Sequence, residues 1–284
     1  MQPSHPPLRS VLYAPGSNLR ALEKGRDLDC DAMIMDLEDA VSPAQKGQAR
    51  ENIRKVLANR GYAHRQIAVR INALDSEWGE GDLEMALSVA VDAIVLPKVE
   101  KAATIQSVAG QIGKDSKIWA MIETPLGVLN ARKIARAHDQ LDCLVMGTSD
   151  LARELHCLHT ADRAPFLTSF GLCILAARAY GRSILDGVHL DLDDDEGFEA
   201  SCRQGRALGF DGKTLIHPKT IDTANRAYSP TEKELEDAHK VIAAHREAEQ
   251  NGSGVVVVNG KLIENLHVEI AERLLQQDRA IRQR

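Results

Sequence analysis

The chain contains little of what marks secreted or membrane-spanning proteins. Of its 284 residues, only 4% are aromatic, and its five cysteines are widely spaced and form no C-x-x-C pair. Few, scattered cysteines are typical of a reduced cytosolic protein rather than of a disulfide framework or a zinc ribbon. The longest uninterrupted apolar run has six residues, Leu172 to Ala177, whereas a membrane-spanning helix needs about 20.

An excess of basic charge is also missing. The sequence has 35 Lys and Arg residues against 41 Asp and Glu residues, which gives a net charge of −6. A nucleic-acid-binding surface needs a basic face or aromatic stacking platforms. Residues 1–7 have neither the charged nor the apolar region of a signal peptide. We therefore expect a cytoplasmic globular protein, most readily an enzyme, that binds neither nucleic acid nor a membrane.

What the sequence does contain is a repeated unit of a short apolar run followed by a helical pattern. Eight such runs begin 22 to 42 residues apart, close to the strand–helix spacing of a (β/α)8 barrel. The runs are Arg9–Tyr13, Asp31–Asp36, Gln66–Ile71, Asp92–Leu96, Lys117–Ile122, Leu141–Met146, Ser183–Asp186 and Asp211–Ile216. An open doubly wound sheet usually has five or six strands and a glycine-rich first turn. The count therefore favours an α/β fold, a (β/α)8 TIM barrel, over residues 1–228.

The character of the sequence changes after residue 228. Thr231 and Glu234 form a capping box that begins a helix, the run Gly254–Gly260 reads as a short strand and turn, and a further helix starts near Asn265. Residues 229–284 are too few to hold a large core of their own. We expect this C-terminal helical extension to pack on the barrel or on a neighbouring subunit.

Two acidic residues follow neighbouring strands of the expected barrel. In this fold the reacting residues lie at the carboxyl ends of the strands, and Glu123 and Asp150 follow the fifth and sixth runs. Mg²⁺ typically binds one or two carboxylates together with water and substrate oxygens. The pair is therefore a candidate magnesium site, although either residue could instead cap the helix that follows it.

Further polar residues end other strands on the same rim. Arg70 could stabilise negative charge on a substrate oxygen, and it could also form a salt bridge with Glu38 or Asp39. His217 follows the eighth run, where it would face bound substrate. The acids and the arginine at the strand ends are therefore expected to converge on one rim of the barrel.

Lys98, which follows the fourth run, has two interpretations. A lysine at a strand end can form a Schiff base, as in metal-independent aldolases. More often such a lysine is an ion-pair partner, here of Asp36 or Glu123.

Six short motifs in order carry a family resemblance. They are Arg9–Ser17, Asp36–Val41, Val69–Asn72, Leu96–Glu100, Glu123–Gly127 and Gly209–Pro218. Together they resemble the citrate lyase β-subunit-like group of the HpcH/HpaI aldolase superfamily, which includes malyl-CoA and citramalyl-CoA lyases. Within this group the chain is most similar to the short malyl-CoA lyase/thioesterase type.

The resemblance implies a Mg²⁺-dependent enzyme that cleaves a carbon–carbon bond in a β-hydroxyacyl-CoA. The products would be an acyl-CoA and a 2-oxo acid such as glyoxylate or pyruvate. The metal ligands of the family fall on Glu123 and Asp150, and its oxyanion-stabilising arginine falls on Arg70.

The resemblance also implies how CoA binds and how subunits cooperate. The acyl-CoA is expected over the loop of the first strand, at Tyr13, Arg20 and Lys24. The family places an acid/base aspartate, in a Gly-x-x-Ile-Asp motif, across a subunit interface of a homotrimer or homohexamer. This sequence has Glu264 at that position, and the extra methylene would move the carboxylate by about 1–1.5 Å, a distance that matters in catalysis.

Other functions remain open from the sequence. A malyl-CoA thioesterase would use the same metal site, and a class II aldolase would act on a free 2-oxo acid. The basic residues Arg9, Arg20, Lys24 and Arg26 favour a CoA ligand, because its phosphates need such groups. A non-catalytic acyl-CoA-binding subunit is the remaining alternative.

Overall fold

Two compact units make up the chain. The computed structural model describes residues 6–59, 61–114, 116–250, 256–258 and 261–284. Residues Leu8–Tyr228 form the first unit, called here the barrel unit. Residues Ser229–Arg284, grouped with Met1–Pro7, form the second, called here the C-terminal unit.

The barrel unit contains a closed barrel of parallel strands, so the predicted fold class is confirmed. The strands are β1 (Ser10–Pro15), β2 (Ala32–Asp36), β3 (Gln66–Arg70), β4 (Ala93–Leu96), β5 (Lys117–Ile122), β6 (Leu141–Met146), β7 (Ser183–Asp186) and β8 (Gly212–Leu215). Each strand pairs with the next, and β8 pairs with β1 to close the ring. All eight runs expected from the sequence are strands.

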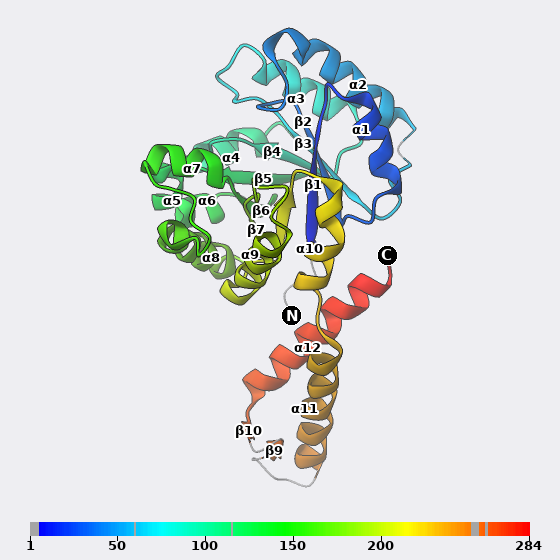
Figure 1. Ribbon diagram of the computed structural model, residues 1–284, viewed down its shortest axis with the longest axis vertical. Coiled ribbons are helices and arrows are strands. Elements are labelled where there is room, and N and C mark those ends of the chain that lie inside the picture. The colour runs from blue at the N-terminus through cyan, green and yellow to red at the C-terminus, as the bar shows by residue number, and fades with distance from the viewer. Residues whose placement is uncertain (1–5, 60, 115, 251–255, 259–260) are drawn as a thin grey trace. The chain divides into compact units, whose positions relative to one another are not determined.

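Helices lie outside the ring of strands (Figure 1). They are α1 (Leu19–Lys24), α2 (Lys46–Ala58), α3 (Gly79–Ser88), α4 (Ala102–Ala109), α5 (Pro125–Leu129), α6 (Ala131–Ala135), α7 (Thr148–Leu155), α8 (Leu167–Ala179), α9 (Asp195–Leu208) and α10 (Ile221–Tyr228). None of the helices in the described ranges is long and apolar enough to cross a bilayer.

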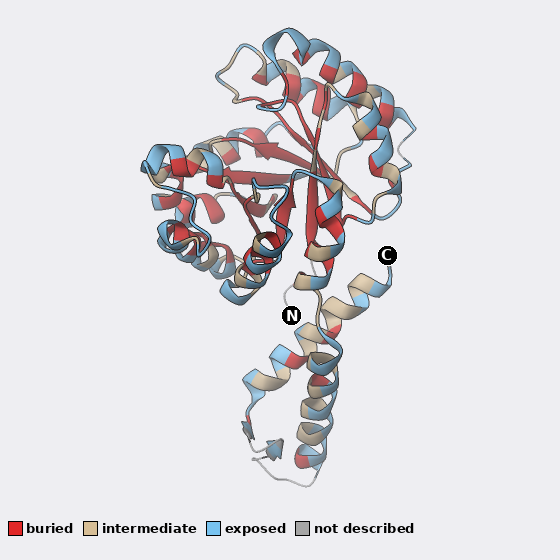
Figure 2. Ribbon diagram, in the orientation of Figure 1, coloured by how far each residue is buried: buried red, intermediate tan, exposed pale blue. Residues whose placement is uncertain are grey.

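Successive side chains of each strand point alternately inward and outward, which creates two apolar layers. Val11, Ile34, Val95 and Trp119 belong to the cluster that fills the barrel. The outward side chains, such as Met33, join the larger cluster between strands and helices. Figure 2 shows the result, with buried strands at the centre and helices exposed on their outer faces. Because both faces of every strand are covered, the sequence has continuous apolar runs instead of alternation.

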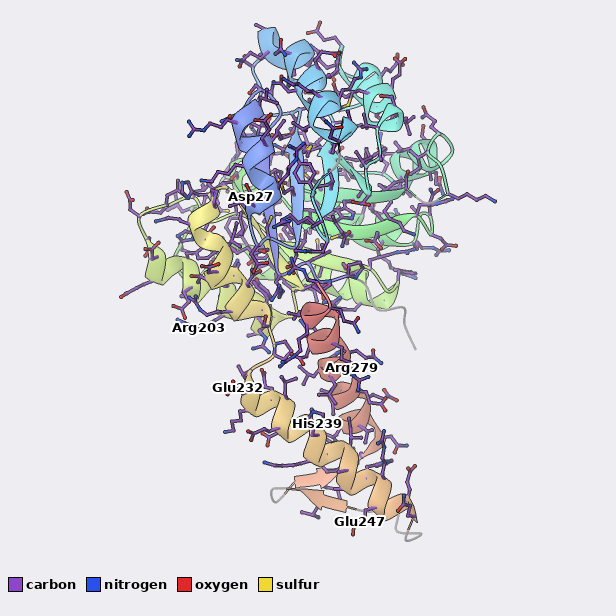
Figure 3. All side chains as sticks on the ribbon, turned by 90° about the vertical axis from the view of Figure 1, so that its right-hand side faces the viewer. Asp27, Arg203, Glu232, His239, Glu247 and Arg279 are labelled. Atoms are coloured by element: carbon purple, nitrogen blue, oxygen red, sulfur yellow. The ribbon has the colours of Figure 1, made fainter. Side chains whose placement is uncertain are left out.

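The C-terminal unit is a pair of packed helices joined by a short hairpin. It consists of α11 (Glu232–Gln250), β9 (Val256–Val258), β10 (Lys261–Ile263) and α12 (Asn265–Arg282). Buried Ala238, Ala271 and Leu275 form the contact between the helices. Figure 3 labels Glu232, His239 and Glu247 along α11 and Arg279 on the adjacent α12.

The start of this unit agrees with the sequence. The hydroxyl of Thr231 accepts a hydrogen bond from the N–H of Glu234, and the carboxylate of Glu234 accepts one from the N–H of Thr231. The expected capping box is therefore confirmed. The expected strand is partly present as β9, while Gly254 and Gly260 lie outside the described residues.

Closure of the barrel depends on the absence of a side chain at Gly212. A Cβ at this position would lie 1.7 Å from the carbonyl oxygen of Leu8, a backbone atom that cannot rotate away. We expect Gly212→Ala to lower the free energy of unfolding by about 1–3 kcal/mol, because the clash forces β8 and β1 apart. Urea unfolding followed by circular dichroism measures this loss.

Gly47→Ala, in α2, is the matched control. A Cβ there would meet no atom within 4 Å, and alanine is favoured over glycine in a helix by about 0.5–1 kcal/mol. The control should be as stable as the unmodified protein or more so. A Gly212→Ala variant of unchanged stability would contradict this account of closure.

Candidate functional site at the mouth of the barrel

The carboxyl ends of the strands bring polar side chains to one end of the barrel. Near the ends of β1, β2 and β3 the inward-facing residues are Tyr13, Asp36 and Arg70. The inward-facing residues earlier in the same strands fill the barrel. Met121 is inward-facing on β5, and Glu123 follows two residues later. Because alternate residues of a strand share a face, these five side chains converge on the mouth.

The central interaction is a buried ion pair between Arg70 and Asp36. Nε and Nη2 of Arg70 donate to the two carboxylate oxygens of Asp36, each at 2.6 Å. Burial alone would lower the pKa of Arg70, but the hydrogen bonds and charge of Asp36 outweigh it and hold that pKa above its ordinary value. The guanidinium therefore stays charged and fixed in a planar, two-bonded geometry.

Tyr13 supports the same guanidinium from one side. The Arg70 guanidinium carbon lies 5.0 Å from the centre of the Tyr13 ring, a cation–π contact. The phenol O–H points to the sulfur of Met121 at 3.7 Å, and Nη1 of Arg70 lies 3.6 Å from the same sulfur. Burial raises the pKa of Tyr13 well above its ordinary value. Its role as a CoA contact stays a prediction.

Glu38 joins two cations at the mouth. Its Oε2 lies 2.9 Å from Nη1 of Arg70, and its Oε1 accepts a hydrogen bond from Nζ of Lys98 at 2.9 Å. Burial raises the pKa of the Glu38 carboxyl, although both cations oppose the rise. The expected salt bridge between Arg70 and Glu38 is thus confirmed, and Asp39 lies farther away at 4.0 Å.

Lys98 does not pair as the sequence suggested. Its ammonium binds Glu38, not Asp36 or Glu123; only its backbone N–H reaches Glu123. Burial would lower the pKa of Lys98, but the hydrogen bond to Glu38 outweighs it, so the pKa is raised. A Schiff base requires a neutral amine. The geometry therefore favours the ion-pair interpretation of Lys98 over the covalent one.

Glu123 is almost completely buried at the mouth. It is 1% exposed, and its Oε1 accepts the N–H of Lys98 at 2.7 Å. Desolvation, reinforced by the charge of Glu38, raises the pKa of Glu123 from 4.5 to about 7. A Cβ at Gly147 would lie 2.3 Å from Oε2 of Glu123, so only glycine leaves space for this carboxylate.

Asp150 lies in the first turn of α7, the helix whose N-cap is next to Glu123. Gly147 is the N-cap of α7, and Asp150 is in its first turn, where it forms an ion pair with Arg153 at 2.6 Å. No side chain caps this helix. The hydroxyl of Thr148 is buried and has no hydrogen-bond partner within the described part of the chain. A helix N-terminus with such a hydroxyl favours an anionic group of a ligand.

The donor set is compatible with one magnesium ion. Three buried acids, Asp36, Glu38 and Glu123, lie near three cations: Arg70, Lys98 and the buried Lys46. Desolvation by burial is the main cause of the raised pKa of Glu123, and the charge of Glu38 adds to it. Over the described ranges, no three His, Cys, Asp or Glu side chains group to hold a metal, but Mg²⁺ needs only one or two protein carboxylates. Glu123, with Asp150 in the first turn of the helix that follows β6, fits that requirement.

Lys46 has a structural role that the sequence does not reveal. It is 5% exposed, and its Nζ donates to the carbonyl oxygens of Leu37 and Glu38 and to the side chain of Asn72, each at 2.8 Å. Burial lowers the pKa of Lys46 against the opposing charges of nearby acids. A lysine in the first turn of a helix normally lies in water, so no sequence signal marks it. It fixes the loop that carries Glu38.

The basic residues proposed for CoA are not one cluster. Arg20 and Lys24 are exposed on α1. Arg9 is 7% exposed, and its guanidinium is bound by Asp31 at 2.9 Å, while Arg26 donates to the carbonyl oxygen of Val56. The expectation that all four are available to phosphate was therefore wrong for Arg9, because its partner is buried with it.

Two other predicted residues take no part in the ion-pair network. His217 is exposed after β8, where its Nδ1 accepts the N–H of Lys219 at 3.1 Å and caps a short 3-10 helix. Glu264 belongs to the C-terminal unit. There it is the N-cap of α12, in a reciprocal pair of bonds with His267. Both assignments stay predictions.

Comparisons with known proteins agree on one family for this chain. Residues 9–218 match the HpcH/HpaI aldolase/citrate lyase family. The chain is 50% identical to a (3S)-malyl-CoA thioesterase of Cereibacter sphaeroides over 97% of its own length and 96% of the relative. It is 35% identical to the citrate lyase subunit beta of Leuconostoc mesenteroides, covering 94% and 92%. The resemblance and the prediction of an enzyme are confirmed.

A solved structure has the same architecture. The CitE protein of Mycobacterium tuberculosis, determined in complex with magnesium, acetoacetate and coenzyme A, has a TM-score of 0.81 and 30% identity. The similarity covers 98% of this chain and 99% of that one. Magnesium, the cofactor expected from the sequence, is thus present in a solved relative.

Because Glu123 is buried, we expect the stability of the metal-free protein to depend on pH. The raised pKa means that the folded protein keeps a proton that the unfolded chain loses above pH 4.5. Stability is therefore lost as the pH rises from 4.5 to about 7, on the order of 3 kcal/mol in full. Glu123→Gln stays neutral, so without metal it should be the more stable protein above pH 7.

Thermal unfolding in EDTA from pH 5 to 8 measures the effect. The difference between Glu123→Gln and the unmodified protein should grow over this range. Glu84→Gln, at an exposed position of α3, is the matched control because no desolvation is relieved there. A Glu123→Gln variant that is less stable than the unmodified protein at pH 8 in EDTA would contradict the assignment.

Proposed function

Because the chain belongs to the HpcH/HpaI aldolase/citrate lyase family, we propose that it is a Mg²⁺-dependent hydrolase of (3S)-malyl-CoA or a closely similar β-hydroxyacyl-CoA. The sequence motifs alone favoured carbon–carbon cleavage first and thioester hydrolysis second. Similarity at 50% identity over almost the whole chain to malyl-CoA thioesterases reverses that order.

One observation carries the proposal: a fixed cation and a buried acid share the mouth of the barrel. Arg70 and Glu123 flank Met121 on the inner face, and the charge of Arg70 acts on the Glu123 carboxyl. A cation beside a site for a divalent metal is suited to an oxygen that becomes negative during the reaction.

Glu123 and Asp150 would hold the metal. When bound, Mg²⁺ supplies positive charge that polarises a substrate oxygen and compensates for the buried acids. The uncapped start of α7 and the hydroxyl of Thr148 would bind the free carboxylate of the substrate. The malyl group would then lie between α7 and Arg70.

Hydrolysis adds water to the thioester carbonyl and releases malate and the free thiol of CoA. Arg70, fixed by Asp36 and stacked on Tyr13, would stabilise the negative carbonyl oxygen of the tetrahedral state. Because Asp36 already orients the guanidinium, little reorganisation is needed when that charge forms. Nη1, which faces Glu38 and the sulfur of Met121, is the part not bonded to Asp36.

A second candidate is the carbon–carbon lyase reaction on the same substrate. It is favoured by Arg70, since cleavage leaves an enolate of the CoA thioester whose oxygen needs the same cation. The lyase would release glyoxylate from malyl-CoA or pyruvate from citramalyl-CoA. The two reactions differ in the bond that breaks: hydrolysis adds water and breaks the C–S bond of the thioester, whereas the lyase breaks the Cα–Cβ bond of the acyl group and adds no water.

We further propose that CoA and a second subunit complete the site. The exposed Arg20 and Lys24 on α1 are available to the CoA phosphates, and His217 is exposed at the end of β8. Glu264, from the C-terminal unit of a neighbouring chain, would transfer the proton in a homotrimer or homohexamer. This arrangement extends the domain assignment, in which residues 229–284 pack against a barrel.

Product analysis distinguishes the two reactions. Purified protein given (3S)-malyl-CoA and Mg²⁺ should release free CoA thiol together with malate. A thiol reagent and chromatography of the acids measure both products, and EDTA should abolish their formation.

Acetyl-CoA with glyoxylate, and no free thiol, would favour the lyase instead. Activity that survives exhaustive EDTA treatment would contradict the metal assignment. CoA-ester binding without turnover of any tested ester would point to a binding subunit.

Arg70→Lys tests the charge-stabilising role. Lysine keeps the charge but cannot form two parallel bonds with Asp36, so we expect kcat to fall by about 10²–10³-fold with the Mg²⁺ affinity retained. Arg203→Met, at an exposed arginine of α9 (Figure 3), is the control and should keep full activity. An Arg70→Lys enzyme of unchanged kcat would refute the role.

A further inference from the structure

Lys98 has an unusual backbone conformation directly after β4. Its φ is 47°, in the left-handed region that residues with a side chain rarely adopt. Such a residue costs the folded state about 1–3 kcal/mol and persists only where its surroundings hold it. Glycine, which would adopt this φ without strain, is not used here.

The turn at Lys98 places one backbone donor against Glu123. The N–H of Lys98 donates to Oε1 of Glu123 at 2.7 Å. Gly147 provides the space for Oε2 on the other side. The carboxylate is therefore fixed at one oxygen, while the other lies beside the start of α7, where Asp150 is found.

The side chain of Lys98 is held in place by an ion pair with Glu38. Nζ lies 2.9 Å from Oε1 of Glu38. Glu38 is itself held at its backbone, because its N–H donates to Asp36 and its carbonyl accepts from the buried Lys46. The ion pair therefore connects the strained turn to a rigid part of the rim.

We infer that Lys98 is a positioning residue: its ion pair with Glu38 maintains the left-handed turn, and the turn orients Glu123 to bind a divalent metal. The inference rests on the proposed function, since it requires Mg²⁺ at Glu123. It assigns Lys98 neither a contact with substrate nor a Schiff base. Second partners that orient a metal ligand commonly change metal affinity by 10–100-fold when removed.

Mg²⁺ titration of the metal-free protein by calorimetry tests the inference. Lys98→Met removes the ion pair while keeping the length of the side chain, and should weaken Mg²⁺ binding by about tenfold or more. Lys98→Arg should restore the affinity, because it can still pair with Glu38. Lys101→Met, at the exposed N-cap of α4, is the matched control and should bind Mg²⁺ normally.

Lys98→Gly separates positioning from substrate contact. Glycine adopts a positive φ without support, so this variant should bind Mg²⁺ more tightly than Lys98→Met although both lack the ammonium. Glu38→Gln removes the same ion pair from the other side, together with the contact between Glu38 and Arg70. Combined with Lys98→Met, it should cause a smaller loss of Mg²⁺ affinity than the sum of the two single losses, because Lys98 and Glu38 share one interaction.

Circular dichroism and thermal unfolding check that each variant is folded, and Lys98→Gly remains informative if Lys98→Met is not. Met and Gly variants that bind Mg²⁺ like the unmodified protein yet lose kcat would overturn the inference in favour of a substrate contact. Trapping of Lys98 by borohydride with substrate would overturn it in favour of a Schiff base. An unmodified protein that binds no Mg²⁺ would overturn both this inference and the proposed function.

Discussion

The ion pair between Asp36 and Arg70 is the interaction on which the mouth of the barrel depends. Asp36 accepts both guanidinium bonds and also the N–H groups of Glu38 and Ala40. One carboxylate thus fixes the arginine of the third strand and the loop after the second. Removing either partner of such a buried pair leaves an uncompensated charge and costs about 3–5 kcal/mol.

Two further carboxyl groups are buried near this pair. Glu38 and Glu123 are both buried, and desolvation raises the pKa of each. A site of this kind reduces the stability of the metal-free protein, a common cost of preorganised functional sites. The apolar barrel interior below, filled by residues such as Trp119 and Val95, provides the rigidity that keeps these charges in place.

The net charge of the chain does not describe the distribution of charge around the site. The net charge of −6 argues against nucleic acid as a partner, yet the proposed ligand, a CoA ester, is itself anionic. Part of the negative charge lies at the mouth, where a divalent ion would compensate for it. Arg20 and Lys24 are exposed on α1, and net charge alone could not identify them.

The sequence by itself determined the barrel fold and the end of the barrel at which the polar residues lie. Each strand was predicted within about two residues, because apolar runs of this length and spacing have few other ways to be buried. Parallel strands share a direction, so residues that follow them must share a rim. Glu123, Asp150 and Arg70 could be chosen on that basis alone.

Only the tertiary structure decided which of these residues touch. The order of the strands does not predict that Lys98 adopts a left-handed backbone conformation and binds Glu38. It also does not predict that Lys46 is buried beneath the loop that carries Glu38. Those contacts depend on the backbone conformation of loops and on side-chain torsions, which no periodic sequence pattern predicts. Contacts at a few ångströms are set by packing, whereas the rim itself is set by topology.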